Sequence, residues 1–267
     1  MKPRPTIQER LSTQRALIGL VQTHPNPSLA EMAGMCGYDF LMVDCEHGVF
    51  SELDHVRTLQ AIGSTDMAAI VRLAGHDPQA LGRYLDMGVD GIIVPNVATA
   101  AQAKDLVRAM DYPPAGTRGF GAPAHRAARY GMDIAAHMKA PRQGASLVVM
   151  IESALGVENA DEILAIDGVD AVIIGPSDLS AGLGCAGDFS QPAYAQAVAR
   201  IERAAAARGK LIGTAPHTGY SLETLVARGH CLFIVGADMP LICEAMSAQV
   251  AKAKSDLALS RQAFTPS

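Results

Sequence analysis

The sequence predicts a (β/α)8 barrel, also called a TIM barrel, because short apolar runs alternate with longer amphipathic segments along its 267 residues. Eight apolar runs occur, at residues 17–22, 39–44, 67–72, 91–95, 147–152, 171–176, 210–214 and 231–236. Each is apolar almost throughout, as expected of parallel strands buried on both faces. The segments between them carry apolar residues at helical spacing, and several begin with Ser, Asp or Thr and end at Gly. Eight strand–helix units in a chain of this length are typical of a closed barrel.

A doubly wound open sheet is the alternative, since the number of strands does not establish closure. The first strand is not followed by the GxGxxG turn of dinucleotide-binding sheets, which favours the barrel. No linker-like stretch divides the chain, so we expect a single barrel domain over residues 1–267. The connection 111–144 is long enough to hold a functional loop and an extra helix. A terminal helix is predicted over about 238–258, and its apolar stripe needs a partner.

Composition and charge exclude several classes of protein. With 49% hydrophobic and 18% charged residues, the chain is globular rather than disordered. The formal net charge is −5 without a cluster of Lys and Arg, so we expect no nucleic-acid partner. No apolar run reaches the roughly 18 residues of a membrane span, and no signal segment is recognisable. The five cysteines lack CxxC spacing and are expected to be core residues in a reducing compartment. These features predict a cytoplasmic protein with no membrane partner.

Charged and polar residues gather just past the ends of the predicted strands. They are Asp44, Glu46 and His47 after the second strand, Arg72 at the end of the third, Glu152 at the end of the fifth, Asp178 after the sixth and His217 after the seventh. In a barrel these positions face one shared mouth. We therefore expect an active site there.

Glu152 and Asp178 follow buried apolar runs, where a carboxylate must be solvated, paired or bound to a cation. The structural alternative is a pair of salt bridges or helix caps, with Asp178 capping a helix from Leu179. Two carboxylates plus water suit Mg²⁺ or Mn²⁺ better than zinc, which prefers His and Cys. The GPSDLS segment adds backbone N–H groups that could bind a carboxylate or phosphate.

His47 and Arg72 are the candidates for proton transfer and charge stabilisation. A lone histidine is more often structural, but the barrel mouth favours a general base. Arg72 needs an anion, which either Asp44 or Glu46 or a substrate oxyanion would supply. Asp86 stands at a predicted helix end, where a solvated or capping acid is the plain interpretation. Arg118 lies in a Gly-rich loop that could either grip an anionic substrate or remain solvated.

The motifs resemble those of the HpcH/HpaI family of class II pyruvate aldolases, from about Ile18 to about Ala245. Six segments carry the resemblance in family order: DFLMVDCEHG, VRLAG, LDMGVDGIIVPNV, YPPAGTRG, MIES and IGPSDLSAGLG. The resemblance implies a (β/α)8 barrel and a homohexamer of dimers that exchange their last helix. It also implies reversible aldol cleavage of a 4-hydroxy-2-oxo acid to pyruvate, or a related 2-oxo acid, and an aldehyde. A divalent ion, Mg²⁺ or Mn²⁺ with Co²⁺ as a further option, would stabilise the enolate of the 2-oxo acid.

The resemblance also implies roles for individual residues. By this resemblance, Glu152 and Asp178 bind the metal ion. His47 is the base, and Asp86 raises its basicity. Arg72 stabilises the oxyanion, and the backbone around Ser177 and Asp178 holds the substrate carboxylate.

One position departs from the family pattern. Many family aldolases carry Gln two residues before the metal-binding Glu, but here the residue is Met150. A substrate hydrogen bond expected there is missing, so the donor or acceptor can differ. MIES is closer to a branch that includes a siderophore-pathway citrate synthase acting on oxaloacetate. The alternatives to an aldolase are therefore such a condensing enzyme, an enzyme acting on malyl or citramalyl thioesters, and a non-catalytic small-molecule-binding barrel.

Overall fold

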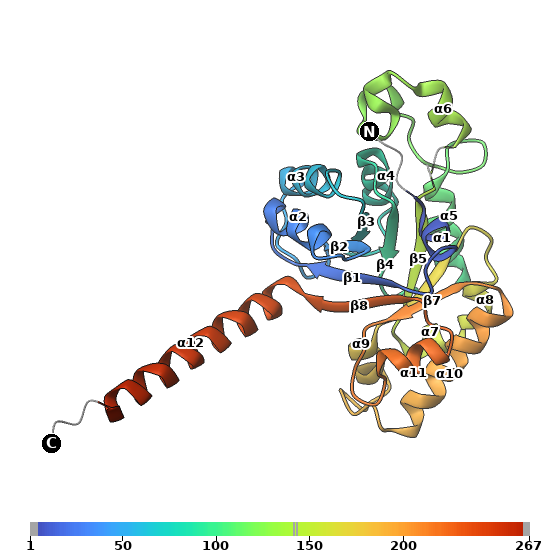
Figure 1. Cartoon of the computed structure of the whole chain (residues 1–267). Helices are drawn as coiled ribbons and strands as arrows, with labels where there is room; N and C mark the ends of the chain where they lie inside the picture. Colours follow the sequence, from blue (N-terminus) through green and yellow to red (C-terminus); the bar gives the residue numbers. More distant parts are fainter. Residues whose placement is uncertain (1–4, 141, 143, 264–267) are drawn as a thin grey trace.

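Eight parallel strands close into a barrel in sequence order, with β8 paired to β1 (Figure 1). The computed structural model describes residues 5–140, 142 and 144–263. The strands are β1 (Leu17–Gln22), β2 (Phe40–Asp44), β3 (Ala68–Arg72), β4 (Gly91–Val94), β5 (Ser146–Ile151), β6 (Ala171–Ile174), β7 (Leu211–Thr214) and β8 (Leu232–Ala237). They coincide with the eight predicted runs to within two residues at each end, so the barrel prediction is confirmed and the open sheet is wrong.

Helices fill most of the connections. They are α1 (Ile7–Leu11), α2 (Pro27–Met35), α3 (Glu52–Ile62), α4 (Pro78–Met87), α5 (Ala100–Met110), α6 (Ile134–Lys139), α7 (Ala154–Glu158), α8 (Ala160–Leu164), α9 (Pro176–Gly182), α10 (Pro192–Ala207), α11 (Leu222–Ala227) and α12 (Asp238–Ala263), with 3-10 turns η1 (Ala122–Ala124) and η2 (Arg126–Gly131). The predicted start signals hold at α3, α4 and α5, where Ser51, Asp77 and Thr99 accept a backbone N–H of the first turn.

The side chains of each strand alternate between two hydrophobic clusters. One set, with Phe40, Ile70, Val148 and Ile173 among its members, fills the inside of the barrel. The other set packs between the strands and the surrounding helices. Because side chains alternate with a period of two, an inward-facing residue at the carboxyl end of a strand places its side chain at the barrel mouth.

The long connection between β4 and β5 contains α5, η1, η2 and α6, as the predicted loop and extra helix require. Arg118 in this connection is buried, with 1% of its side chain exposed. Its guanidinium stacks on the Tyr112 ring at 4.7 Å and pairs with Asp86. Neither interpretation of a solvated or substrate-gripping Arg118 describes this packing, because the guanidinium is enclosed by its own chain.

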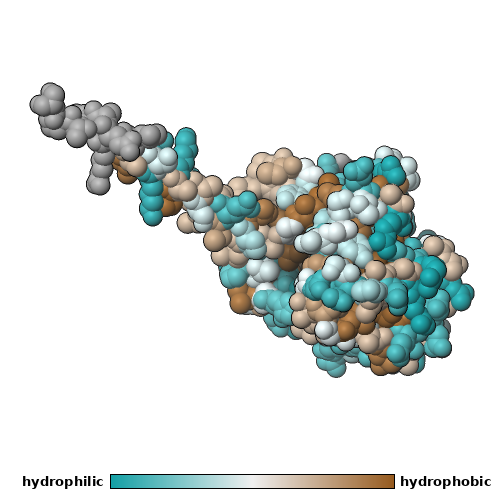
Figure 2. Space-filling view, turned by 90° about the horizontal axis from the view of Figure 1, so that it is seen from below, coloured by the Kyte–Doolittle hydropathy of each residue, from teal (hydrophilic) through white to brown (hydrophobic). Residues whose placement is uncertain are grey.

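Helix α12 projects from the barrel into solvent (Figures 1 and 2). It runs to Ala263, five residues beyond the predicted end. Hydrophobic side chains are exposed along it, among them Met246 at 64% and Val250 at 52%. Cys243 on α12 and Cys36 after α2 are also exposed, so the prediction of core cysteines is wrong for these two. Within the described ranges, no helix is long and apolar enough to cross a membrane.

Candidate active site

Three charged side chains continue the inward-facing positions of their strands at the barrel mouth. Asp44 and Arg72 end β2 and β3 as register partners, and Glu152 directly follows β5. Arg72 donates from Nε to Asp44 Oδ1 at 2.9 Å and from a terminal nitrogen to Oδ2 at 2.7 Å. Burial opposes both charges, but their hydrogen bonds and attraction prevail, so the pKa of Asp44 is lowered and that of Arg72 is raised. Arg72 is thus held rigidly in its mouth-facing position.

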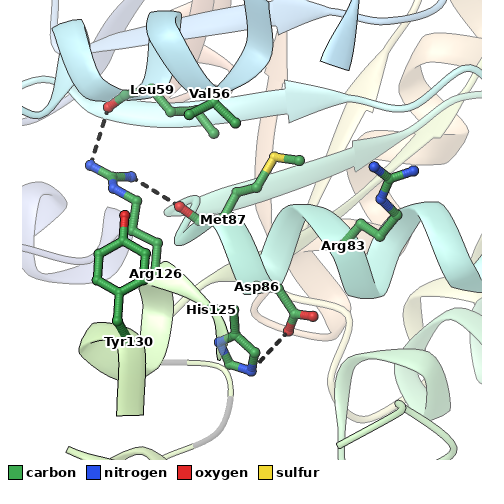
Figure 3. A pocket seen from close by; sticks show the side chains of 8 residues that line it. All are labelled: Val56, Leu59, Arg83, Asp86, Met87, His125, Arg126 and Tyr130. Atoms are coloured by element: carbon green, nitrogen blue, oxygen red, sulfur yellow. Dashed lines mark hydrogen bonds and ion pairs between the residues drawn. The ribbon is translucent and has the colours of Figure 1, made fainter. Parts of the chain in front are cut away.

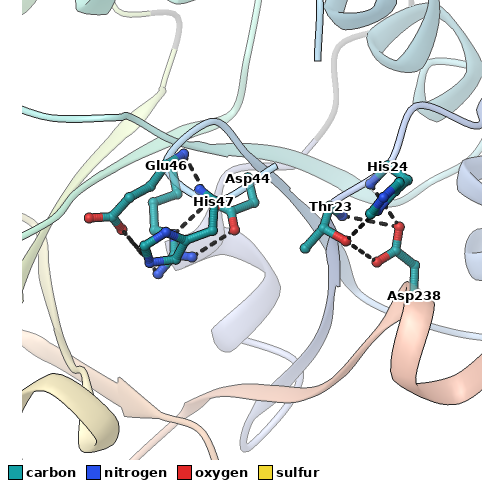
Figure 4. A network of polar contacts seen from close by, with 7 residues as sticks. Thr23, His24, Asp44, Glu46, His47 and Asp238 are labelled. Atoms are coloured by element: carbon teal, nitrogen blue, oxygen red, sulfur yellow. Dashed lines mark hydrogen bonds and ion pairs between the residues drawn. The ribbon is translucent and has the colours of Figure 1, made fainter. Parts of the chain in front are cut away.

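Glu46 and His47 lie side by side in the loop after β2, next to Asp44 (Figure 4). The Oε2 of Glu46 is 3.3 Å from a guanidinium nitrogen of Arg72 and 3.8 Å from His47 Nε2. The His47 side chain is 65% exposed, so it is open to solvent and to a ligand. The Asp44 carboxylate accepts the backbone N–H groups of Glu46 and His47 at 3.0 and 3.3 Å. One buried carboxylate therefore orients both the arginine and the histidine loop.

Glu152 is a buried carboxylate with 7% exposure. Its Oε1 accepts the Asn96 N–H at 2.8 Å, and Asn96 adopts φ 47° to present that group. A Cβ at position 175 would lie 2.2 Å from Oε2, so Gly175 leaves the space that Glu152 occupies. Burial, together with the negative charges of Asp178 and Glu46, raises the pKa of Glu152 to about 7. An anion in this setting gains from a bound cation.

Asp178 and Ser177 lie in the first turn of α9, directly after β6, and both are exposed. The charge of Asp178 acts on Glu152, so the two carboxylates predicted to bind metal are electrostatic neighbours. Among the described residues, no group of three or more His, Cys, Asp or Glu side chains could hold a metal ion. Two carboxylates nevertheless fit Mg²⁺ or Mn²⁺, which commonly bind one or two protein carboxylates and take their other ligands from water and substrate. The donor chemistry of the mouth is compatible with the expected ion.

Asp86 is separated from His47 within the chain. It lies on α4, where its Oδ1 accepts from Arg118 at 2.5 Å and is 3.4 Å from His125 Nε2. Figure 3 shows Asp86 and His125 facing each other in a pocket lined by residues of α3, α4 and η2, which does not include His47. Among the residues that the structure describes, the contacts of Asp86 do not include His47. Within the described residues of one chain, no direct contact therefore supports the predicted effect of Asp86 on His47.

Met150 and His217 take up packed positions near the mouth. Met150 is 3% exposed and belongs to the cluster inside the barrel. Its thioether lies on the inward face of β5, two residues before Glu152. His217 donates or accepts through Nε2 with the Tyr194 hydroxyl at 2.9 Å and stacks on Tyr220 at 4.6 Å. Its ring is therefore held in an aromatic cluster.

Several mouth residues escaped the sequence-based prediction. Asn96 and Gly175 shape the Glu152 position through a backbone amide and a missing side chain, which no motif of charged residues reveals. Gln22 ends β1 fully buried and donates to the backbone of His24 and Asn26. A polar residue ending an apolar run was the available signal. Asp238 after β8 carries the same signal.

Comparison with known proteins agrees with this geometry. The model of the HpcH/HpaI aldolase/citrate lyase family matches residues 18–245. The chain belongs to this family. A hydroxypyruvate/pyruvate aldolase of Delftia acidovorans is 37% identical over 248 residues, covering 92% of this chain and 91% of the relative. A 2-keto-3-deoxy-L-rhamnonate aldolase of Klebsiella pneumoniae is 36% identical, covering 90% of each chain.

Solved structures of similar proteins share the barrel. A family protein from Burkholderia cenocepacia superposes with a TM-score of 0.85 at 30% identity, over 93% of this chain and 98% of that one. The citrate synthase SbnG superposes with a TM-score of 0.84 at 26% identity, over 94% and 98%. Family membership and the aldolase relatives identify the chain as a carbon–carbon lyase of the aldolase type.

Proposed function

We propose that the protein is a divalent-metal-dependent aldolase that cleaves a 4-hydroxy-2-oxo acid into a small 2-oxo acid and an aldehyde, and catalyses the reverse condensation. The observation that carries the proposal is Glu152, a buried carboxylate at the barrel mouth with a pKa of about 7. It has a second carboxylate, Asp178, as electrostatic neighbour, and its only hydrogen bond in the described structure comes from a neutral amide. Such a site is completed by a cation.

The side chains around Glu152 can divide the work of the reaction. A bound Mg²⁺ or Mn²⁺, held by Glu152 and Asp178, would supply positive charge for the oxygen of the 2-oxo acid on which negative charge develops. Arg72 would stabilise the same charge from the end of β3, where Asp44 already orients its guanidinium. His47, exposed beside this arginine, would move the proton of the hydroxyl or methyl group through water. Ser177 and Asp178 would present backbone N–H groups to the substrate carboxylate.

We propose that Asp86 raises the basicity of His47. Within the described part of one chain, the carboxylate of Asp86 pairs with Arg118 and has no contact with His47, so we propose that its effect on His47 comes from another copy of the protein. The exposed apolar face of α12 supports such an assembly, since a monomer rarely leaves a hydrophobic helix unpaired. We propose a homohexamer built from three dimers, in each of which the two subunits exchange α12.

The relatives named for hydroxypyruvate, pyruvate and 2-keto-3-deoxy-L-rhamnonate support pyruvate or hydroxypyruvate as the donor. Met150 favours a second candidate, because the hydrogen-bonding amide of many family aldolases is absent. A citrate-forming condensation on oxaloacetate is consistent with the structural likeness to the citrate synthase SbnG.

Proton NMR of pyruvate in D₂O tests the proposal without knowledge of the aldehyde. Protein stripped with EDTA is compared with protein restored with Mg²⁺ or Mn²⁺, and EDTA is added before recording. Metal-dependent loss of the methyl signal is expected for the wild type and not for Glu152→Gln. No exchange of pyruvate, with metal-dependent formation of citrate from oxaloacetate and an acetyl thioester, would favour the second candidate. Neither exchange of a 2-oxo acid nor formation of citrate would refute both.

A further inference from the structure

Asp238, the first residue of α12, is a buried carboxylate at the mouth that the proposed reaction does not use. It is 2% exposed. Its Oδ2 accepts the N–H groups of Thr23 and His24, each at 3.0 Å. Its Oδ1 accepts the Thr23 hydroxyl at 2.7 Å and the N–H of Met239 at 2.9 Å. Among the described residues it forms no ion pair, so neutral donors from the loop after β1 satisfy this charge.

Thr23 connects Asp238 to the loop that carries Glu46 and His47. The carbonyl of Thr23 accepts the N–H of Val49 at 3.0 Å. A Cβ at Gly48 would lie 2.1 Å from the Asp44 carbonyl and 3.0 Å from that of Thr23, so the loop backbone packs closely against both. Figure 4 shows the Thr23–Asp238 contacts beside those of Asp44, Glu46 and His47. The loop is held by Asp44 on one side and by Thr23 on the other.

We propose that Asp238 is a positioning residue that holds the His47 loop through Thr23 and ties this loop to the root of α12. Removing its carboxylate leaves the Thr23 and His24 donors unpaired in a buried place and releases the segment to which Val49 is bonded. The inference rests on the proposed function only for the role of His47; the mechanical link rests on the hydrogen bonds. Because α12 begins at Asp238, the orientation of the projecting helix and that of the loop are joined by two hydrogen-bonded steps.

Two variants of Asp238 and one control test this link in the full-length protein. Asp238→Ala removes every acceptor. Asp238→Asn is the conservative variant, because its amide oxygen can still accept from Thr23 and His24. Asp39→Ala is the matched control: the carboxylate of Asp39 accepts the backbone N–H of Ile18 at 2.8 Å, at the end of β1 opposite to Thr23.

Hydrogen–deuterium exchange of peptides covering residues 45–50 and 146–152 is measured together with kcat, KM and the Kd for Mn²⁺. For Asp238→Ala we expect about tenfold faster exchange in the 45–50 peptide and unchanged exchange in the 146–152 peptide. We also expect kcat to fall about 10- to 100-fold, with KM and the Mn²⁺ Kd within about threefold of the wild type, because the loop rather than the metal site is displaced. Asp238→Asn should recover most of the loss, and Asp39→Ala should match the wild type.

Unchanged exchange in 45–50 in Asp238→Ala would overturn the proposal, as would a parallel loss of kcat and Mn²⁺ binding. If Asp238→Ala does not fold, Asp238→Asn replaces it, since Asn leaves one acceptor bond unmade. Its 45–50 peptide should then exchange faster than that of Asp39→Ala, and equal exchange in the two variants would overturn the proposal. A wild type without metal-dependent turnover would refute the proposed function but not the link, which the exchange of the 45–50 peptide then decides by itself.

Discussion

Asp44 and Arg72 face each other across β2 and β3 as register partners and form two hydrogen bonds between their side chains. The same Asp44 carboxylate accepts the N–H groups of Glu46 and His47. The position of the charge-stabilising arginine and that of the histidine loop therefore depend on one buried acid.

Neutralising Arg72 should slow turnover much more than it weakens substrate binding, because the arginine acts on charge that grows during the reaction. For Arg72→Gln we expect kcat to fall about 10²- to 10³-fold, with KM changed less than about threefold. Since Asp44 would be left as an unpaired buried charge, the double variant Asp44→Asn/Arg72→Gln serves as the stability control. Equal losses in kcat and in substrate affinity would remove the oxyanion role.

Metal binding should weaken on the acid side of neutrality. Burial raises the pKa of Glu152 to about 7, so below that pH the carboxyl must lose a proton before it binds a cation. Calorimetric titration with Mn²⁺ should show an affinity that is constant above about pH 7.5 and falls about tenfold per pH unit below about pH 6.5. If the affinity for Mn²⁺ does not change between about pH 5.5 and about pH 8.5, Glu152 is not a metal ligand.

The metal-free protein should be stabilised by Glu152→Gln at alkaline pH. Because the folded state raises the pKa from 4.5 to about 7, it binds the proton more tightly than the unfolded chain. The resulting stability is present at low pH and is lost as pH rises through about 7. In EDTA at alkaline pH we expect Glu152→Gln to gain about 1 to 2 kcal/mol in unfolding free energy. Thermal melts should show this gain disappearing in acid, and saturating Mg²⁺ should favour the wild type. A gain equal at all pH values would point to packing instead.

Replacing Met150 should alter the choice of donor. Met150→Gln introduces an amide that can bond a polar substrate atom, and one such bond changes selectivity by about tenfold. We expect kcat/KM to shift by this factor towards hydroxypyruvate relative to pyruvate. Met150→Leu, which conserves volume and polarity, should leave the ratio unchanged. If both variants shift the ratio alike, packing rather than hydrogen bonding governs this position.

Charges on the apolar stripe of α12 should break the assembly. Met246→Glu/Val250→Glu places carboxylates on a stripe that also includes Ile242 and Cys243. We expect light scattering after size exclusion to give a smaller mass than for the wild type, because a paired apolar face excludes unpaired charge. Ala248→Glu, on the opposite side of the helix, is the control. An unchanged mass for the double variant would refute pairing through this stripe.

Much of this protein could be predicted from its sequence. Continuous apolar runs are typical of parallel strands covered on both faces, and eight of them with helices between favoured the barrel, whose closure the structure established. Asp44, Arg72 and Glu152 were then placed at the mouth by their positions at strand ends. The motif resemblance predicted the family in which the chain is found.

Tertiary structure alone decided how those side chains are used. The burial of Glu152 behind Gly175 and Asn96, the pairing of Asp86 with Arg118, and the contact of Asp238 with Thr23 join residues up to 215 positions apart. Such contacts depend on the closure of the barrel and on where each loop returns, which no local pattern encodes. Periodicity determines which way a side chain faces along its own strand; its partner, burial and charge state come from elements that only folding brings together.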